Sequence, residues 1–381
     1  AIGASRSLAI LLACNEMWHT LTQAEYGWIL AGERLVDLPC WKMMHERLAS
    51  RTSVRAMIMG GAHEGGKLCK HNHFIPLQQM ASANTLGGGA WCKSSVGLNV
   101  PKREAVCSAR VGGSVFVVGG HDGHTALDSV ERLDYRAGEL PGERQPTGST
   151  AGRGWIETDP LTTARCFAAC CGDKVSQRLW VTGGGTSMYV GATTFNSTEC
   201  WDSKQNRWSE QPLPTMLSKR CGHAMLPTMA GSIIAVGGYG GGRDYWSTVE
   251  MLDVNFTTNR TSWTHLPSMS CPRTGLGAAL GPDGAVYVVG GSSNGSNALG
   301  SVERLDLRTK TWQSLPPLRF PRSFAVAGFS GDGALFVAGG SGRSSCLASL
   351  EVFDPRAGVW DIDMAGRLLH ARENAALTII I

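Results

Sequence analysis

Arginine recurs in this sequence ten or twelve residues after a tryptophan. The arginines are Arg103, Arg165, Arg220, Arg273, Arg322 and Arg372, and the tryptophans before them are Trp91, Trp155, Trp208, Trp263, Trp312 and Trp360. A guanidinium group holds a carboxylate with two parallel hydrogen bonds, so such a set predicts a site for acidic groups. An arginine fixed in every repeat also suits a framework role, paired with a glutamate such as Glu303 or with backbone carbonyls. Both interpretations stay open.

Other residues that could bind a metal ion or take part in redox chemistry form weaker patterns. Cys69, His71 and His73 alternate along one segment, which could place three metal ligands on one side. No fourth ligand is evident nearby, so a solvated loop is the better interpretation. Cys170 and Cys171 would point to opposite faces of a strand and pack in the core. The sequence shows no nucleophile elbow, phosphate loop or paired-carboxylate motif. We therefore expect no catalytic residue, no metal and no cofactor.

Loops that follow glycine pairs hold a second set of candidates for ligand binding. These are His121, Tyr239, Arg243, Tyr245, Asn294 and Arg343. Aromatic and arginine side chains are the usual anchors of protein interfaces, so Tyr239, Arg243 and Tyr245 are the strongest of these candidates. In the alternative interpretation, the two tyrosines pack locally against the glycine-rich backbone around them.

The candidate residues belong to a repeat that fills most of the chain. The glycine pairs begin at Gly60, Gly119, Gly183, Gly237, Gly290 and Gly339, and five units carry a glutamate before the tryptophan: Glu131, Glu199, Glu250, Glu303 and Glu351. Short runs rich in β-branched residues precede the glycines, as in Val286–Val289. Such runs predict strands buried on both faces. Units of about four short strands bury their apolar faces by stacking radially as blades.

This order of residues resembles the kelch repeat, over about residues 51–381. The resemblance implies an all-β fold, a six-bladed kelch-type β-propeller, with the repeated arginines near the mouth of a central channel. Kelch-like ubiquitin-ligase adaptors use arginines in that region to hold acidic peptides. Some kelch proteins are enzymes, such as the copper-radical galactose oxidases. The six tyrosines of this chain show no arrangement with histidine and cysteine that would suit such a site.

The two ends of the repeat region indicate how such a ring would close. Only enough chain for one strand precedes Gly60, while Leu368–Ile381 adds an apolar strand after the last tryptophan. We expect the C-terminal strand to complete the blade opened by residues 54–60. The alternative is a seventh unit, of which Trp41 and Arg51 would be remnants.

Residues 1–50 differ from the repeats. They lack glycine pairs and carry apolar residues at three- and four-residue steps, which indicates a helical N-terminal segment. The segment resembles the second half of an F-box, and we interpret it as a remnant of an F-box-like or other adaptor domain, or as a helix capping the propeller. A third interpretation is a secretory or lipoprotein signal with Cys14 as its anchor. The predicted domains are therefore 1–50 and 51–381.

Composition narrows the partners and the compartment. The 381 residues carry a net charge of +4 without a basic block, which gives no indication of nucleic-acid binding. No apolar run is long enough to span a membrane. Twelve cysteines are scattered across the repeats, which favours a reducing cytoplasmic location, with the nucleus as a second one. Four sequons, at Asn196, Asn255, Asn259 and Asn294, would matter only if the chain were secreted.

These observations predict a non-catalytic protein-interaction module that binds an acidic peptide at the channel mouth. By the resemblance, its leading role would be substrate recognition for a cullin-type ubiquitin ligase, with components of that ligase as further partners. The alternative is a secreted or periplasmic carbohydrate-active kelch propeller, of the mutarotase or oxidase class.

Overall fold

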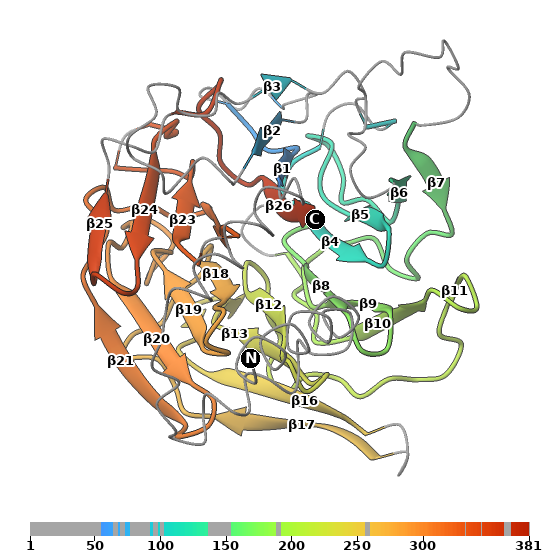
Figure 1. The fold of residues 1–381 in the computed structure, drawn as a ribbon. Coiled ribbons are helices and arrows are strands. Elements are labelled where there is room, and N and C mark those ends of the chain that lie inside the picture. Colours follow the sequence, from blue (N-terminus) through green and yellow to red (C-terminus); the bar gives the residue numbers. More distant parts are fainter. Residues whose placement is uncertain are drawn as a thin grey trace, which may run out of the picture. The chain divides into compact units, whose positions relative to one another are not determined.

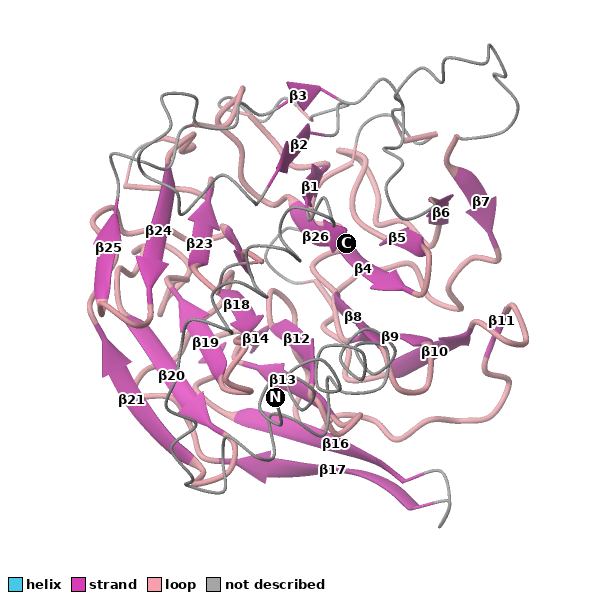
Figure 2. Cartoon of the chain, in the orientation of Figure 1, coloured by secondary structure: helices cyan, strands magenta, loops and turns pink. Residues whose placement is uncertain are grey.

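The computed structural model describes residues 55–63, 68, 73–76, 92–93, 98–99, 103–135, 154–187, 192–255, 260–331, 333–343, 345–361 and 367–380. All of them belong to one compact unit of the chain, Ala49–Ile381. Within these residues the structure consists of strands, turns and loops (Figure 2). The helical segment expected in residues 1–50 lies outside the described residues, as do Trp91, Cys69 and His71.

Five four-stranded antiparallel sheets are each built from strands of one repeat unit. They contain β4 (Cys107–Val111), β5 (Ser114–Val118), β6 (Val130–Asp134) and β7 (Ile156–Thr158); β8 (Ala169–Asp173), β9 (Arg178–Thr182), β10 (Thr198–Asp202) and β11 (Arg207–Trp208); β12 (Ala224–Pro227), β13 (Ile233–Val236), β16 (Val249–Asn255) and β17 (Arg260–Leu266); β18 (Gly277–Leu280), β19 (Val286–Val289), β20 (Val302–Asp306) and β21 (Thr311–Leu315); and β22 (Val326–Phe329), β23 (Leu335–Ala338), β24 (Leu350–Asp354) and β25 (Val359–Asp361). A small hairpin, β14 (Tyr239–Gly241) and β15 (Asp244–Tyr245), extends the loop between β13 and β16.

A further four-stranded sheet is assembled from both ends of the described chain. It contains β26 (Ala376–Ile380), β1 (Arg55–Met59), β2 (His73–Pro76) and β3 (Cys92–Lys93), in that order. β26 pairs with β1 in antiparallel register, with Arg55 opposite Ile380 and Met59 opposite Ala376. The C-terminal strand is therefore paired with the residues before Gly60, as expected.

The sheets are arranged as a closed ring (Figure 1). One edge strand of each sheet lies toward the centre, and we call these the inner strands. They are β4, β8, β12, β18, β22 and β26; each contacts the next, and β26 contacts β4. The contact between the last and first inner strands closes the ring.

The expected fold, a six-bladed propeller with a helical N-terminal segment, needs two corrections. The described residues form five blades of consecutive strands, and a composite sheet takes the remaining place in the ring. In that sheet β1 precedes Gly60, and the inner strand, β26, comes from the C-terminal end of the described chain, so the four strands are not consecutive in sequence. The described part of the chain also contains no helix, since its sequence consists of short β-branched runs separated by glycine turns.

The second strand of each blade explains the apolar runs in the sequence. All four residues of β13, β19 and β23 are buried. These strands are covered on both faces because the blades on either side pack against them. The poor alternation of polar and apolar residues in these runs follows from that position.

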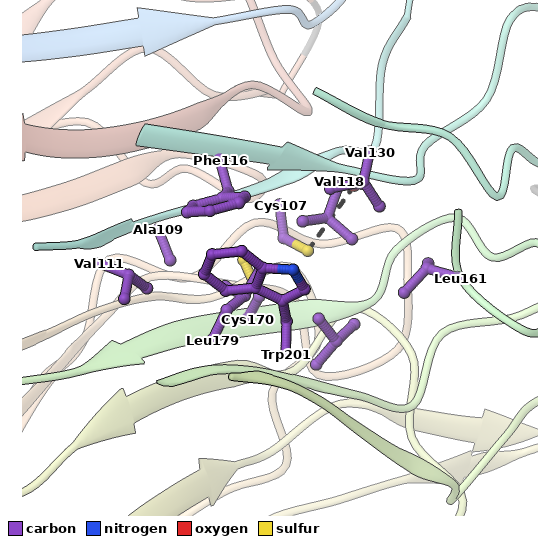
Figure 3. Packing of buried hydrophobic residues seen from close by; sticks show 11 residues of the cluster. Cys107, Ala109, Val111, Phe116, Val118, Val130, Leu161, Cys170, Leu179 and Trp201 are labelled. Atoms are coloured by element: carbon purple, nitrogen blue, oxygen red, sulfur yellow. Dashed lines mark hydrogen bonds between the residues drawn. The ribbon is translucent and has the colours of Figure 1, made fainter. Parts of the chain in front are cut away.

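Apolar side chains of neighbouring blades interdigitate. In the cluster of Figure 3, Phe116 of β5 packs against Trp201 of β10, with ring centroids 4.8 Å apart. Cys107 and Cys170 lie in the same cluster. Burial raises the pKa of Cys170 and of Cys171 well above the ordinary range of a thiol, so both stay protonated. The predicted core packing of Cys170 and Cys171 is confirmed.

Four of the repeated tryptophans link their blade to the loop before it. Their indole Nε1 atoms donate to backbone carbonyls at 2.7–3.1 Å: Trp208 to Asp159, Trp263 to Pro214, Trp312 to Pro267 and Trp360 to Pro316. Trp263 is buried, whereas Trp312 is half-buried. The recurrence of tryptophan is therefore explained by packing between blades.

Candidate binding face

The loops that follow the glycine pairs and the segments that enter the inner strands lie at one end of the ring. Antiparallel bridges join the two kinds of segment in each repeat, for example Glu104 with His121 and Thr274 with Ser292. We call this end the loop face. The repeated arginines and the loop candidates all belong to segments on it.

The six repeated arginines are buried, with at most 2% of each residue exposed. Five form ion pairs with the glutamate of the same blade: Arg103 with Glu131, Arg165 with Glu199 at 2.6 Å, Arg220 with Glu250 at 2.6 Å, Arg273 with Glu303 at 2.5 Å and Arg322 with Glu351 at 2.5 Å. Arg372, which precedes the composite sheet, donates to the carbonyl of Gly60 at 3.2 Å. Each guanidinium is thus engaged within the protein.

Each arginine also connects two blades through the glycine pairs. Nη1 of Arg322 donates to the carbonyl of Gly339 in its own blade at 3.0 Å. The carbonyl of Arg322 accepts the N–H of Gly291, from the preceding blade, at 2.9 Å. Gly290 has a φ of +59°, and a Cβ added there would collide with this same carbonyl. Arginine and glycine pair therefore form one structural unit, which recurs around the ring.

The electrostatics of these arginines agree with a framework role. Burial lowers the pKa of Arg103, Arg165, Arg220 and Arg322, and the charge of each partner glutamate opposes that shift. A guanidinium remains protonated despite such a shift. A ligand at the loop face would therefore meet side chains other than the repeated arginines.

Two of the loop candidates stabilise their own loops. His121 is buried, and its Nδ1 accepts the N–H of Gly123 at 3.1 Å. Burial also lowers the pKa of His121. Asn294 is exposed, and its Oδ1 accepts the N–H groups of Ser296 and Asn297 at 3.0 and 2.9 Å, which holds a tight turn.

The remaining loop candidates divide into packed tyrosines and exposed arginines. Tyr239 and Tyr245 lie opposite each other in the β14–β15 hairpin, with ring centroids 5.0 Å apart. The Tyr239 hydroxyl donates to the carbonyl of Gly242 at 3.2 Å. Both rings are half-buried, so the local-packing interpretation describes them better. Arg243 at the hairpin tip and Arg343 in the loop of another blade are exposed.

Exposed basic side chains gather on one side of the loop face. Lys219 and Arg243 lie in loops of the β12–β17 blade, and Arg319 and Arg343 lie in loops of the β22–β25 blade. Among the described residues of these loops and of the intervening blade's loops on the same face, the exposed acidic residues are Asp244 and Glu210, and Glu210 is paired with Arg207. We call Lys219, Arg243, Arg319 and Arg343 the basic sector.

A ring of residues that the sequence did not predict surrounds the axis of the propeller on this face. Two residues after each repeated arginine, a backbone N–H donates to the carbonyl of the equivalent residue in the preceding blade, at 2.6–3.3 Å. The six residues are Ala105, Phe167, Gly222, Gly275, Phe324 and Asn374, all with φ between +52° and +59°. The six hydrogen bonds form a closed circle, which we call the axial ring. Glycine at two of its positions was the only sign in the sequence.

Two pockets of the surface lie away from these candidates. One of about 330 Å³ is lined partly by Arg178 and Asp202, which form an ion pair at 2.9 Å. Another, of about 270 Å³, lies beside Ile156 and Trp201. In the described ranges, no three His, Cys, Asp or Glu side chains are placed to hold a metal ion. None of the described residues forms a helix of the length and apolarity that crossing a membrane requires.

Comparison with known proteins gives matches to kelch proteins. The model of the Kelch motif matches residues 102–139, 274–319 and 323–362. Kelch repeat and BTB domain-containing protein 8 of Danio rerio is 27% identical over 214 residues, which are 52% of this chain and 29% of that protein. Kelch domain-containing protein 8B of Rattus norvegicus is 28% identical over 176 residues, 45% of this chain and 48% of that protein. Kelch-like protein 35 of Mus musculus is 28% identical over 200 residues, 51% of this chain and 28% of that protein.

A solved structure titled "Structure of YjhT" is similar with a TM-score of 0.58 and 16% sequence identity, over 72% of this chain and 87% of that chain. At this identity the likeness concerns the fold alone. The motif matches fall on three of the described blades, where glycine pair, glutamate and arginine make the contacts given above. The chain thus contains Kelch motifs and is similar to kelch proteins over about half of its length.

Proposed function

We propose that this chain is a non-catalytic protein-interaction module that binds an acidic segment of a partner protein on the loop face. The proposal is supported by the two groups of basic side chains on this face, one buried and one exposed. The repeated arginines are buried against glutamates, whereas the four residues of the basic sector are exposed. Exposed cations gathered on one side of a surface create a positive potential that attracts carboxylates.

A more specific role follows from the relatives and remains part of the proposal. One relative is named for a BTB domain and another is a kelch-like protein, and this chain matches less than a third of each. We propose substrate recognition for a cullin-type ubiquitin ligase, with residues 1–50 as part of the region that contacts other ligase components. The relatives' names do not favour the carbohydrate-active alternative.

The proposed compartment is the cytoplasm. Five cysteines in the described part of the chain are buried free thiols. Free buried thiols persist in a reducing compartment, where they act as small apolar side chains.

The test measures binding of a fluorescein-labelled glutamate-rich peptide by fluorescence anisotropy, with a glutamine-rich peptide of the same length for comparison. We expect the acidic peptide to bind more tightly, and more weakly as salt rises, since salt screens exposed charges. Replacing Lys219, Arg243, Arg319 and Arg343 together by alanine should weaken binding about tenfold, as the loss of several exposed ion pairs predicts.

The control replaces two exposed basic residues at the other end of the blades, Arg308 and Lys310, by alanine. This variant should bind the acidic peptide as the wild type does. Equal binding of both peptides, or equal weakening in the control variant, would show that the basic sector does not bind acidic segments.

A further inference from the structure

Phe167 and Phe324 form an aromatic pair across the axial ring, with ring centroids 5.6 Å apart. Both are half-buried, and they lie outside the hydrophobic clusters that the described residues form between blades. Blade packing therefore does not account for these two large apolar side chains at the axis.

Their backbone conformation makes the choice of residue more unusual. Phe167 has a φ of +52° and Phe324 of +53°, where a bulky side chain is disfavoured. Gly222 and Gly275 occupy equivalent positions of the same ring without that strain. Because glycine suits the ring, the phenylalanines are not needed to form it. Strained residues of this kind are frequent where a protein contacts a ligand.

One side of the aromatic pair is acidic. Following the hydrogen bonds of the ring, Ala105 and Asn374 lie between Phe167 and Phe324. The residues just before these two are Glu104 and Glu373. Asn374 Nδ2 donates to Glu104 Oε2 at 3.2 Å, so a carboxylate lies beside the ring.

Within the described part of the chain, a buried carboxylate and a buried acceptor without a donor lie together here. Glu104 is 7% exposed. Burial, together with the nearby Glu373 carboxylate, raises the pKa of Glu104 against the opposing hydrogen bond from Asn374. Among the described residues, no donor reaches the buried Asn374 Oδ1 atom. A positively charged donor would neutralise the charge of the two carboxylates and would also donate a hydrogen bond to the Asn374 amide oxygen.

We propose that the axial ring binds a cationic side chain of the partner, an alkylguanidinium or alkylammonium group, on the face of the Phe167–Phe324 pair and beside Glu104 and Glu373. Aromatic faces attract such cations, and the neighbouring carboxylates select a cation over an apolar group. The proposal rests on the proposed function, since it adds one basic residue to the acidic segment bound by the basic sector. The partner segment would thus place its basic residue at the axis and its acidic residues on the surrounding loops.

The experiment uses the full chain labelled with 4-fluorophenylalanine and follows its ¹⁹F NMR signals. The probes are N-acetyl-arginine amide and its uncharged apolar counterpart, N-acetyl-norleucine amide. The variants Phe167→Gly and Phe324→Gly assign the two signals, and both should fold because glycine suits this backbone conformation. We expect arginine amide to shift both signals and norleucine amide to shift neither.

Variants of the acceptors test the charge requirement. Replacing Glu104 and Glu373 together by glutamine keeps the oxygen that accepts from Asn374 and should weaken binding of arginine amide about tenfold. Phe324→Gly should weaken it about fivefold. The matched control, Asp128→Asn, removes an exposed carboxylate from another loop of this face and should have no effect. Equal shifts with both probes would mean an apolar surface only, and unchanged binding in the double variant would also overturn the proposal.

The acidic peptide described above separates this inference from the proposed function. If that peptide binds while arginine amide shifts no signal, the cation site is wrong and the interaction module stands. If arginine amide binds as expected but the acidic peptide does not, the basic sector is wrong and the axial site stands.

Discussion

Arg322 Nη2 and Glu351 Oε1 form an ion pair at 2.5 Å, with both side chains completely buried. The other carboxylate oxygen of Glu351 accepts the N–H of Arg319 at 2.8 Å, so the glutamate also fixes the loop that leads to the arginine. Arg322 in turn bonds to the carbonyls of Gly339 and Ser349, both at 3.0 Å. The pair therefore holds together a loop, a glycine turn and a strand, which explains why these residues recur in the sequence.

Arg322→Ala should destabilise the propeller strongly. Removing one partner leaves the Glu351 carboxylate buried without its countercharge, which typically costs about 3–5 kcal/mol in the free energy of unfolding. Urea denaturation measures the change. The control is Arg207→Ala, whose ion pair with Glu210 is largely exposed and should contribute about 1 kcal/mol or less. Equal effects of the two substitutions would contradict the framework role.

A double substitution decides between the two interpretations of the repeated arginines. A ligand-binding role predicts that Arg273→Ala combined with Arg322→Ala weakens binding without lowering the melting temperature. Because both arginines are buried, the framework role predicts instead that the double variant has a lower melting temperature than the wild type. Thermal melting monitored by circular dichroism is sufficient to distinguish them.

Gly290→Ala should be far more damaging than Gly358→Ala. Both glycines have positive φ, +59° and +69°, so alanine is strained by about 1 kcal/mol at either position. Only at Gly290 does the added Cβ also collide with the carbonyl of Arg322, whereas it meets open space at Gly358. We expect a difference of at least about 2 kcal/mol in the free energy of unfolding, measured by urea denaturation. Similar losses at the two positions would mean that the collision is relieved without cost.

The repeat was predictable from the sequence because its residues have fixed types and fixed contacts. Gly290 needs its conformation, Glu303 pairs with Arg273, and the strand at Val286–Val289 must be apolar on both faces. The glutamate partner of the arginines was already one of the two interpretations. Residue types therefore predicted the structure wherever the same contact recurs in every blade.

The axial ring was not predictable for the opposite reason. Its residues share a backbone conformation and a hydrogen bond but no side-chain type, as Ala105, Phe167 and Gly222 illustrate. The basic sector was also only partly foreseen. Arg243 and Arg343 stood in recognisable loops, whereas Lys219 and Arg319 lie in segments whose exposure depends on how the chain enters the next blade.

Deleting the chain from Ala376 onward should destabilise the whole ring. β26 is the inner strand of the composite sheet and pairs with β1 along its length. Its loss leaves β1 with an unpaired edge and removes the contacts of β26 with β4 and β22. The control Thr378→Ala removes a hydrogen bond to Ser108 at 2.7 Å and one buried methyl group but keeps the strand pairing, and it should cost about 1–2 kcal/mol. A truncated chain that melts at the wild-type temperature would show that β26 does not close the ring.

His223 should make the protein sensitive to acid. It is 6% exposed, and its Nε2 is bonded to Thr182 Oγ1 at 2.9 Å, while among the described residues no partner reaches Nδ1. Burial, with the charges of Arg220 and Arg165, lowers the pKa of His223 to about 3. In the unfolded chain the imidazole takes up a proton below pH of about 6.5. Protonation then favours the unfolded state, so stability is present above that pH and is lost as the pH falls toward about 3.

The loss due to His223 should approach about 1.4 kcal/mol for each pH unit below its unfolded pKa. His223→Leu removes the titrating group, so its free energy of unfolding should fall less steeply with acid than that of the wild type. Urea denaturation at neutral pH and at mildly acidic pH gives the two slopes. His265→Gln, at an exposed histidine, should keep the wild-type slope. A His223→Leu slope equal to the wild-type slope would show that His223 is not the source of the acid sensitivity, whatever carboxylates elsewhere contribute.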